Sequence, residues 1–390
     1  MEGMKKVLWC IPFLFVLSAC GSSEVKQIVL ENTDGRAHVD EALLFTREEM
    51  LFAPVVRDEK GELVACQADD MDGDGKWDEF AFVYSLEPGQ KAVLSLEWVE
   101  PEDYPQFASR TNIRYGKMYA PGDIRELKTD VHGKYNLARG EGYPYQMDGI
   151  AWENDKMGFR HYFDGRNCRD VFGKRVSDMV LDTVGIRPEG IPGDTYHVLA
   201  GWGRDIMSAA NSFGLGGLAL QTQDSLVRLG VTIDKTVDNV DSTRYALIAE
   251  GPVRSVFDLD FYGWEVPGGK IDVKETVTIW AGKFGYENKV RTSALPDSTY
   301  LVTGIVSNFN DMPYEKKQFG DYTAMMTHDK QTYNKEWYMG MALIIPNNNL
   351  AETFDAPKDS ADIIKTWCAR LKPDMDSLYH FNAYAAWELT

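Results

Sequence analysis

Residues 153–205 hold side chains whose types can transfer protons or neutralise a negative charge. They are Glu153, Arg160, Tyr162, His197 and Asp205. Side chains of these types act as general acids and bases, and an arginine can hold a carboxylate by paired hydrogen bonds. We predict that the catalytic residues lie among them.

Elimination from a uronate is one reaction that such a set could support. It needs a cation against the substrate carboxylate and a base for the proton at C5. The cation would be Arg160 or Arg166. The base would be His197, Tyr162 or His161.

Hydrolysis of a glycosidic bond needs two carboxylates that flank the bond, and the candidates are Glu153, Asp164 and Asp205. A mutarotase-like epimerase would instead pair a His with a Glu. The sequence spacing leaves these reactions open, because the groups meet only in the folded chain.

Substrate binding is predicted for aromatic and charged side chains of the same stretch. A sugar ring can lay its apolar face on an aromatic ring, while Arg and Asp bind hydroxyl groups or a carboxylate. The predicted binding residues are Trp152, His161, Asp164, Arg166 and Trp202.

Strand periodicity divides residues 157–164 between two faces. One face carries Phe159 and His161 and is typical of a core, so His161 could also be an ordinary buried histidine. The other carries Arg160 and Tyr162, and is either a binding face or the solvated face of a strand. Trp152 and Glu153 belong to the preceding strand of the predicted hairpin, with the turn at 154–156.

The run D-x-D-x-D-G-x-x-D at residues 70–78 has calcium-loop spacing. Alternate carboxylates converge when the chain coils tightly, the glycine permits the turn, and the seventh residue can offer its carbonyl oxygen. A full EF-hand would need Glu where Ala81 stands. We predict a structural Ca²⁺ site in a β-turn, the alternative being a metal-free Asp/Gly turn. The predicted ligands are Asp70, Asp72, Asp74, Lys76 and Asp78.

Short strand-like runs separated by Gly, Asp, Asn and Pro must position these groups, so the fold is predicted to be all-β. We expect a small β module at 21–105 with the acidic loop, and a large antiparallel β-sandwich at 106–390 with the carbohydrate site. A short helix is expected at 204–211, and residues 362–371 are ambiguous. The predicted strands are 26–31, 79–84, 92–98, 255–266, 272–281, 301–307 and 338–345.

Residues 1–20 are predicted to be a lipoprotein signal peptide. Lys5 and Lys6 precede an uncharged apolar run that is shorter than the roughly 20 residues of a membrane-spanning helix. The run ends Leu-Ser-Ala-Cys, which resembles a bacterial lipobox, so Cys20 is the predicted lipid attachment site. The protein would then be lipid-anchored in the cell envelope, on the periplasmic side or the outer surface. An ordinary signal peptide that contains a cysteine is the alternative.

Composition excludes some partners and cofactors. The formal net charge of −19 argues against nucleic acid, which needs a basic footprint. Cys66, Cys168 and Cys368 are too widely spaced for a metal motif and are expected to be small buried side chains. The glycines at 214–217 lack a nucleotide-binding pattern and favour a bulge or a close backbone approach. We predict no nucleotide or redox cofactor.

Several segments resemble the family called domain of unknown function 4861. They are YQMDGIAWENDKMGFRHYFDGR, DVFGK, GWGRD, NSFGLGGLAL and, near the N-terminus, DMDGDGKWDEFAF. The resemblance implies an envelope protein of glycan-degrading bacteria, encoded beside pectin- and uronate-acting enzymes. It also implies a β-supersandwich like that of galactose mutarotase. It transfers no catalytic residue.

The expected function is therefore a carbohydrate-active envelope lipoprotein, a lyase or hydrolase of uronate-containing, pectin-type fragments. A non-catalytic glycan-binding lipoprotein and a mutarotase-like or epimerase-like enzyme are the alternatives. A structural envelope protein with merely solvated polar strands is a third. The residues whose convergence on one pocket would separate these are Trp152, Arg160, His197, Trp202 and Asp205.

Overall fold

The computed structural model describes residues 5–6, 17–19, 26–46, 53–135, 143–357 and 362–389. Nearly all its regular structure is antiparallel strand, so the predicted all-β class is confirmed. None of the described helices is long and apolar enough to cross a membrane. The helices are short 3-10 turns: η1 (Pro101–Asp103), η2 (Gln146–Asp148), η3 (Thr195–His197) and η4 (Tyr333–Lys335).

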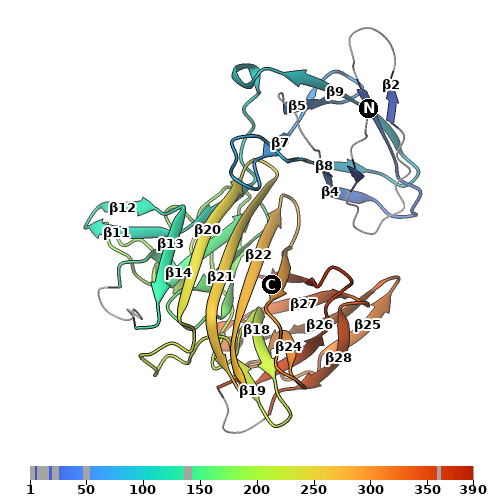
Figure 1. The fold of residues 1–390 in the computed structure, drawn as a ribbon. Coiled ribbons are helices and arrows are strands. Elements are labelled where there is room, and N and C mark those ends of the chain that lie inside the picture. Colours follow the sequence, from blue (N-terminus) through green and yellow to red (C-terminus); the bar gives the residue numbers. More distant parts are fainter. Residues whose placement is uncertain are drawn as a thin grey trace. The chain divides into compact units, whose positions relative to one another are not determined.

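The chain divides into two compact units (Figure 1). The smaller takes the N-terminal part to Thr111 together with two later segments, Ile248–Ser255 and Trp280–Lys283. The larger comprises Asn112–Leu247, Val256–Ile279 and Phe284–Thr390. The sequence placed a single division at residue 105. The sequence does not show that the ends of three long strands, β20 (Ser242–Glu250), β21 (Arg254–Val266) and β22 (Gly269–Trp280), belong to the smaller unit.

The smaller unit is a sandwich of two antiparallel sheets. Ile28 and Leu94 from one sheet pack with Phe45 and Phe82 from the other in a single apolar core. One sheet has the order β1 (Lys5–Lys6), β4 (His38–Thr46), β8 (Glu79–Leu86), β7 (Cys66–Asp69). The other has the order β2 (Leu17–Ala19), β3 (Lys26–Glu31), β9 (Lys91–Val99), β5 (Ala53–Arg57), β6 (Leu63–Val64). Strands β1 and β2 fall in the predicted signal peptide.

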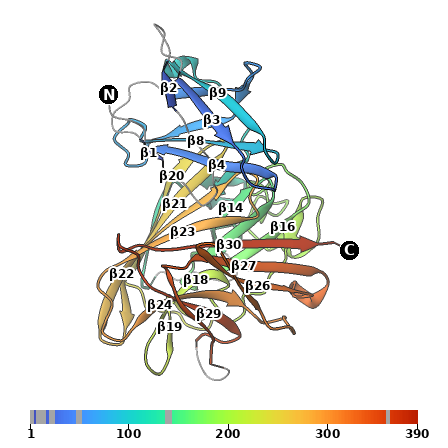
Figure 2. The same ribbon diagram turned by 90° about the vertical axis from the view of Figure 1, so that its right-hand side faces the viewer.

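The larger unit is built on one nine-stranded sheet. Figure 1 shows its long strands β20, β21 and β22 side by side, and Figure 2 shows β30, β27 and β26 continuing the layer. The order is β13 (Thr129–Gly133), β20 (Ser242–Glu250), β21 (Arg254–Val266), β22 (Gly269–Trp280), β23 (Gly285–Thr292), β30 (Tyr379–Glu388), β27 (Tyr338–Pro346), β26 (Tyr322–Asp329), β25 (Glu315–Phe319).

Two five-stranded sheets pack on that layer and share its core, which makes the predicted supersandwich. The first has the order β10 (Thr111–Arg114), β14 (Gly149–Asn154), β15 (Met157–Tyr162), β16 (Arg169–Lys174), β17 (Gly203–Asp205). The second has the order β19 (Leu226–Arg228), β18 (Leu215–Gln221), β24 (Tyr300–Val306), β29 (Thr366–Leu371), β28 (Leu350–Asp355). A separate hairpin joins β11 (Gly116–Ala120) and β12 (Asp123–Glu126).

Alternating side chains explain how the large core forms. In β21, Phe257, Leu259 and Phe261 are buried in the core, as their period-two spacing predicts. The intervening Asp258 and Asp260 point to the other face, where they pair with Lys274 at 2.7 Å and Arg244 at 2.9 Å. Each strand therefore supplies one apolar row to the sandwich.

The predicted strands are confirmed, but the short helix at 204–211 is wrong. Residues 203–205 pair with β16 as strand β17, and an irregular segment follows to Phe213. The ambiguous segment 362–371 contains strand β29. The expected bulge at the glycines is confirmed, because the β18–β24 register shifts between Leu215 and Leu218. Gly214 has a φ of +76°, and an added Cβ would lie 1.7 Å from the carbonyl oxygen of Arg169.

The outer face of the first five-stranded sheet is covered by residues 175–202, which contain only one short 3-10 helix. Leu181, Val184 and Tyr196 of this cover pack on Phe172 and Ala151 of the sheet. A long connection of this kind usually carries function. It encloses polar side chains of the sheet that would otherwise face water.

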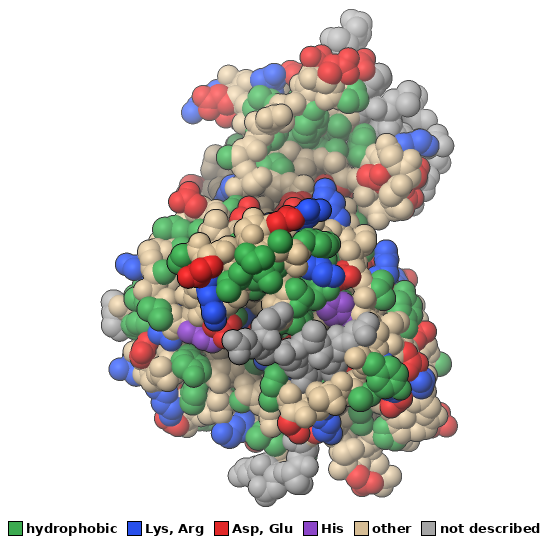
Figure 3. Space-filling view, turned by 90° about the vertical axis from the view of Figure 1, so that its left-hand side faces the viewer, with side chains coloured by type: hydrophobic (Ala, Val, Ile, Leu, Met, Phe, Trp, Pro, Cys, Tyr) green, Lys and Arg blue, Asp and Glu red, His purple; other side chains and the backbone are tan. Residues whose placement is uncertain are grey.

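The surface mixes charges of both signs. Figure 3 shows acidic and basic side chains interspersed over one face of the described residues. The net charge of −19 is therefore not gathered in one block on that face.

Candidate functional site

The hairpin of β14 and β15 sets which side chains face the cover. Phe159 and His161 point into the sandwich core, and Arg160 and Tyr162 point the opposite way, as predicted. The antiparallel register places Arg160 opposite Asp170 on β16. All residues of β14, β15 and β16 are buried, so this second face is a polar layer inside the protein and not a solvated strand face.

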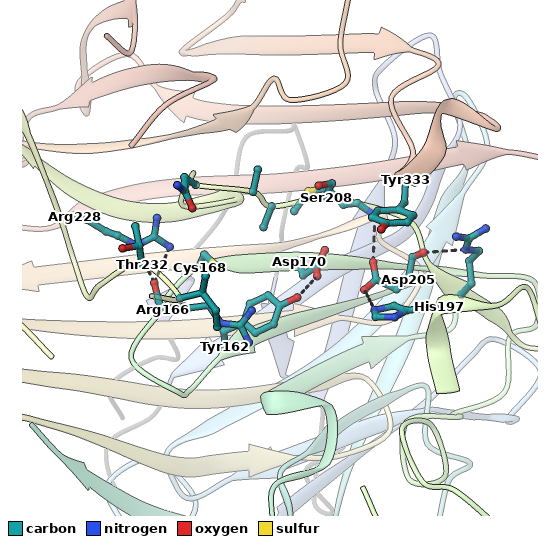
Figure 4. Close-up of a pocket in the computed structure, with 16 residues that line it drawn as sticks. Tyr162, Arg166, Cys168, Asp170, His197, Asp205, Ser208, Arg228, Thr232 and Tyr333 are labelled. Carbon is teal, nitrogen blue, oxygen red and sulfur yellow. Dashed lines mark hydrogen bonds and ion pairs between the residues drawn. The ribbon is translucent and has the colours of Figure 1, made fainter. Parts of the chain in front are cut away.

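A cavity of about 290 Å³ opens at the edge of this layer. Tyr162, Asp170 and Asp205 line it from the sheet, and His197 lines it from the cover. Figure 4 shows Arg228, Thr232 and Arg166 at one end and Asp205, His197 and Tyr333 at the other, with Asp170 and Tyr162 between them. Its volume is at the lower end of the roughly 300–1,000 Å³ of ligand pockets. It therefore suits one sugar-sized group better than a long chain.

Two carboxylates of the cavity wall share one buried arginine. Nη2 of Arg160 donates hydrogen bonds to Asp170 and, at 3.0 Å, to Asp205. The Tyr162 hydroxyl donates to the same oxygen of Asp170 at 2.8 Å. Arg160 does not line the cavity. It lies beneath the two carboxylates, with its guanidinium 4.2 Å from the centre of the Tyr162 ring.

Burial changes the proton affinity of two of these groups, Asp205 and Tyr162. Loss of water around Asp205, reinforced by the negative charge of Asp170, raises the pKa of the Asp205 carboxyl well above its ordinary value. Asp170 instead accepts hydrogen bonds from both Arg160 and Tyr162. Burial also raises the pKa of the Tyr162 phenol well above its ordinary value. The cavity thus holds a carboxyl that keeps its proton to higher pH, Asp205, next to Asp170, which two donors hold in place.

The mouth of the cavity carries the more exposed groups. His197 is half-exposed, its Nε2 lies 3.7 Å from Oδ2 of Asp205, and its ring stacks on that of Tyr333. Arg204 bonds Glu336 at 2.7 Å and thereby holds the η4 segment beside the opening. Tyr333 offers an exposed aromatic ring on which a sugar could stack.

Two predicted binding residues are corrected by their burial. Trp152 is completely buried, and its ring packs against Phe159, Phe257 and Tyr286 in the core. His161 is also in the core, where burial and then Arg169 lower its pKa to about 3. Neither side chain can reach a substrate. The alternative reading of His161 as a buried histidine is the one the structure favours.

Glu153, Asp164 and Trp202 do not line the cavity either. Glu153 is buried and bonds Lys174 and the backbone N–H groups of Val180 and Leu181, so it fastens the cover to the sheet. Asp164 bonds Nε of Arg166 at 2.8 Å and orients that side chain. Trp202 lies edge-on to Phe172 in the cover.

Of the residues whose convergence was to be tested, His197 and Asp205 line one cavity and Arg160 lies under its wall. Trp152 and Trp202 lie elsewhere. Asp170, Arg228 and Tyr333 are cavity residues that the sequence analysis missed. The alternation within 169–174 could have placed Asp170 beside Arg160. No sequence signal brings residues 228 and 333 to this edge.

The acidic loop lies in the smaller unit. Asp70, Asp72 and Asp78 each offer an oxygen, and these atoms lie within 4.8 Å of one another. The backbone N–H of Gly75, followed by those of Gly73 and Asp74, holds the pKa of Asp70 below its ordinary value. Asp74 lies outside this group, and Lys76 pairs with it at 3.7 Å. The three cysteines expected to be buried are buried and free. Cys20 lies outside the described residues.

The fold is that of a β-supersandwich with a small N-terminal β unit and an acid-lined cavity in the larger one. The model of the family described as "Domain of unknown function (DUF4861)" matches residues 30–390, so the chain belongs to that family.

One curated relative is the Formosa agariphila protein described as "Uncharacterized protein P7". It is 26% identical over 150 residues, which cover 35% of this chain and 35% of that protein. Two solved structures are similar to this chain at 9% identity, both from Enterococcus faecalis. One is titled an alpha-mannosidase (strain V583; TM-score 0.44) and the other a protein in the glycosyl hydrolase family 38 (TM-score 0.46). Each similarity covers 93% of this chain but only 43% and 44% of the other, so the chain spans less than half of their length.

Proposed function

We propose that this protein is a carbohydrate-active hydrolase that removes a sugar from the end of a uronate-containing, pectin-type fragment. The observation that carries the proposal is the pair Asp170 and Asp205 in one cavity, joined through a single Arg160 nitrogen. Two carboxyl groups, one of which keeps its proton to higher pH, are the usual acid–base machinery of glycoside hydrolysis. The small volume favours a terminal residue over the middle of a chain.

The roles follow from the contacts of each group. Asp205 holds a proton at higher pH than an ordinary carboxyl, so it is the general acid that protonates the leaving oxygen. Asp170 is the partner carboxylate that meets the positive charge developing at the sugar carbon. Arg160 and Tyr162 orient Asp170 from behind. His197 at the mouth exchanges the proton of Asp205 with water.

Lyase chemistry is the second candidate, and one observation bears on it. Elimination needs a base that is unprotonated near neutral pH. Burial keeps the Tyr162 phenol protonated, which leaves His197 as the candidate base of the cavity. A purely binding protein would not need two buried carboxyl groups that share one arginine nitrogen.

The first test is to incubate the protein, without residues 1–20, with pectic and other uronic-acid oligosaccharides. Products would be followed by mass and by the ultraviolet absorbance of an unsaturated uronate. A hydrolase gives fragments that gain one water without new absorbance. New absorbance would show that the protein is a lyase. Binding of an oligosaccharide without any product would show that it is a glycan-binding protein.

The variant His197→Ala tests whether the mouth residue takes part in the reaction. We expect activity to be lost, while the free energy of unfolding changes by no more than about 0.5 kcal/mol because the side chain is half-exposed. A large fall in stability would instead make His197 a packing residue. Activity assays and urea unfolding on the same preparation would separate the two.

A further inference from the structure

The arginines of the cavity differ in how their charge is balanced. Arg166 is paired with Asp164 and Asp148, and Arg204 is paired with Glu336. Arg228, at the end of the cavity away from Asp205, forms no ion pair with any carboxylate of the described residues (Figure 4).

Backbone carbonyl oxygens hold the Arg228 guanidinium in place. Nε and Nη2 donate to the carbonyl oxygen of Arg166 at 3.1 and 2.8 Å. Nη1 donates to that of Ser212 at 2.6 Å and, at 3.5 Å, to that of Asp362. A guanidinium has five N–H donors, and these contacts use four of them. The group is therefore rigidly oriented, with one Nη2 hydrogen outside these bonds.

Burial makes this unbalanced charge costly. Arg228 is 3% exposed, and loss of water around it lowers the pKa of its guanidinium. The Cys168 thiol is its other polar neighbour, and burial raises the pKa of that thiol. A buried cation held by carbonyl dipoles and a thiol attracts an anion more strongly than a solvated one does. The half-exposed Asp362 carboxylate offsets part of this charge from a distance, but it pairs with Lys235 at 3.7 Å and forms no ion pair with Arg228.

We propose that the Arg228 end of the cavity binds a negatively charged group of the sugar, a carboxylate or a sulfate, while the acid pair at the other end acts on its glycosidic bond. The inference rests on the proposed function for the identity of the ligand as a sugar. It adds the feature that selects it: an oriented, unpaired guanidinium. Arg228 is then a specificity-determining residue, and neutral sugars bind poorly because they leave its charge unmatched.

The test compares matched pairs of ligands by calorimetric titration of the wild-type protein. The pairs are galacturonate with galactose and glucuronate with glucose, and galactose 6-sulfate distinguishes sulfate from carboxylate. We expect the anionic member to bind at least tenfold more tightly, with an advantage that shrinks as salt is added. Equal binding of both members, or binding of neither, would overturn the inference.

Variants then assign the preference to one side chain. Arg228→Gln should remove the preference for the anion and leave the affinity for the neutral member unchanged. Arg175→Gln is the matched control, since Arg175 is an exposed arginine outside the cavity lining, and it should keep the preference. If Arg228→Gln does not fold, Arg228→Lys is the second variant, and it should weaken the preference because it lacks the planar fork of donors.

The outcomes separate this inference from the hydrolase proposal. A charge preference lost in Arg228→Gln, without turnover of any oligosaccharide, would support the anion site and count against hydrolysis. Equal turnover of acidic and neutral fragments would support hydrolysis and overturn the anion site. A preference kept in Arg228→Gln would show that another cation carries it.

Discussion

At the residue scale, the informative groups are those whose neighbours change their proton affinity. Asp205 is buried next to Asp170, and both contact one nitrogen of Arg160. Tyr162 and Arg160 lie on the face that strand periodicity indicates. Asp170 lies on the neighbouring strand directly opposite Arg160. Strand alternation alone thus predicts the positions of Arg160 and Tyr162. The position of Asp170 depends on the register between two strands, which alternation does not give.

The variant Asp205→Asn tests the general acid. We expect the rate of hydrolysis to fall by about 10²–10⁴-fold, the usual contribution of acid–base catalysis, with substrate binding retained. Comparing kcat and KM of the variant with those of the wild type checks this. A rise in KM with kcat unchanged would contradict the role.

The pH dependence of the wild type follows from the same group. Asp205 must be protonated to act as an acid, so activity should fall as the pH rises through its raised pKa. The folded protein also keeps a proton that the unfolded chain releases. Its stability contribution from Asp205 therefore decreases as the pH rises from the unfolded to the folded pKa. A kcat/KM profile with no alkaline limb would rule out this assignment.

A carboxylate of the same stretch, Glu153, has a structural role, and sequence spacing alone does not distinguish it from a catalytic carboxylate. We expect Glu153→Gln to lower the free energy of unfolding by about 3–5 kcal/mol, because it leaves Lys174 buried without its partner. Activity per folded molecule should be retained, since Glu153 does not line the cavity. Urea unfolding and assays on soluble protein would check both, and lost activity with unchanged stability would restore Glu153 as catalytic.

At the element scale, strands were predictable and their neighbours were not. Apolar alternation located β3, β8, β9 and β21, because a half-buried strand must repeat every two residues. The helix expected at 204–211 failed since residues 203–205 pair with β16, and pairing outweighs local helix preference. Arg228 reaches the cavity from β19 and Tyr333 from η4, and one sequence does not encode locally that these two elements meet.

The acidic loop gives a prediction at the same scale. We propose that Asp70, Asp72 and Asp78 bind Ca²⁺, as their oxygens already converge. Added Ca²⁺ should raise the Tm, and a concentration 100 times the Kd would add about 2.7 kcal/mol to the free energy of unfolding.

The double variant Asp72→Asn with Asp78→Asn should abolish this rise in Tm. Asp74→Asn should keep it, because Asp74 lies outside the group. A Tm that is the same in Ca²⁺ and in a chelator would leave a metal-free turn.

At the scale of the whole molecule, one sandwich carries the site and a second, smaller unit carries the acidic loop. Composition and strand spacing predicted this all-β architecture. They did not reveal that residues 248–255 and 280–283 return to the smaller unit. These residues are the ends of β20, β21 and β22 with the turns that follow, and no local pattern assigns strand ends to a unit.

Attachment to a membrane also belongs to the whole molecule. We propose that cleavage before Cys20 and acylation of its thiol anchor the protein in the envelope, because Lys5, Lys6 and the apolar run end in a lipobox-like sequence. Cys20→Ser should shift the protein from the detergent phase to the aqueous phase on phase separation, since acyl chains provide the apolar surface that partitions. Cys66→Ser is the matched control, as that buried thiol cannot take a lipid. Wild-type protein recovered in the aqueous phase with an intact Cys20 thiol would establish an ordinary signal peptide instead.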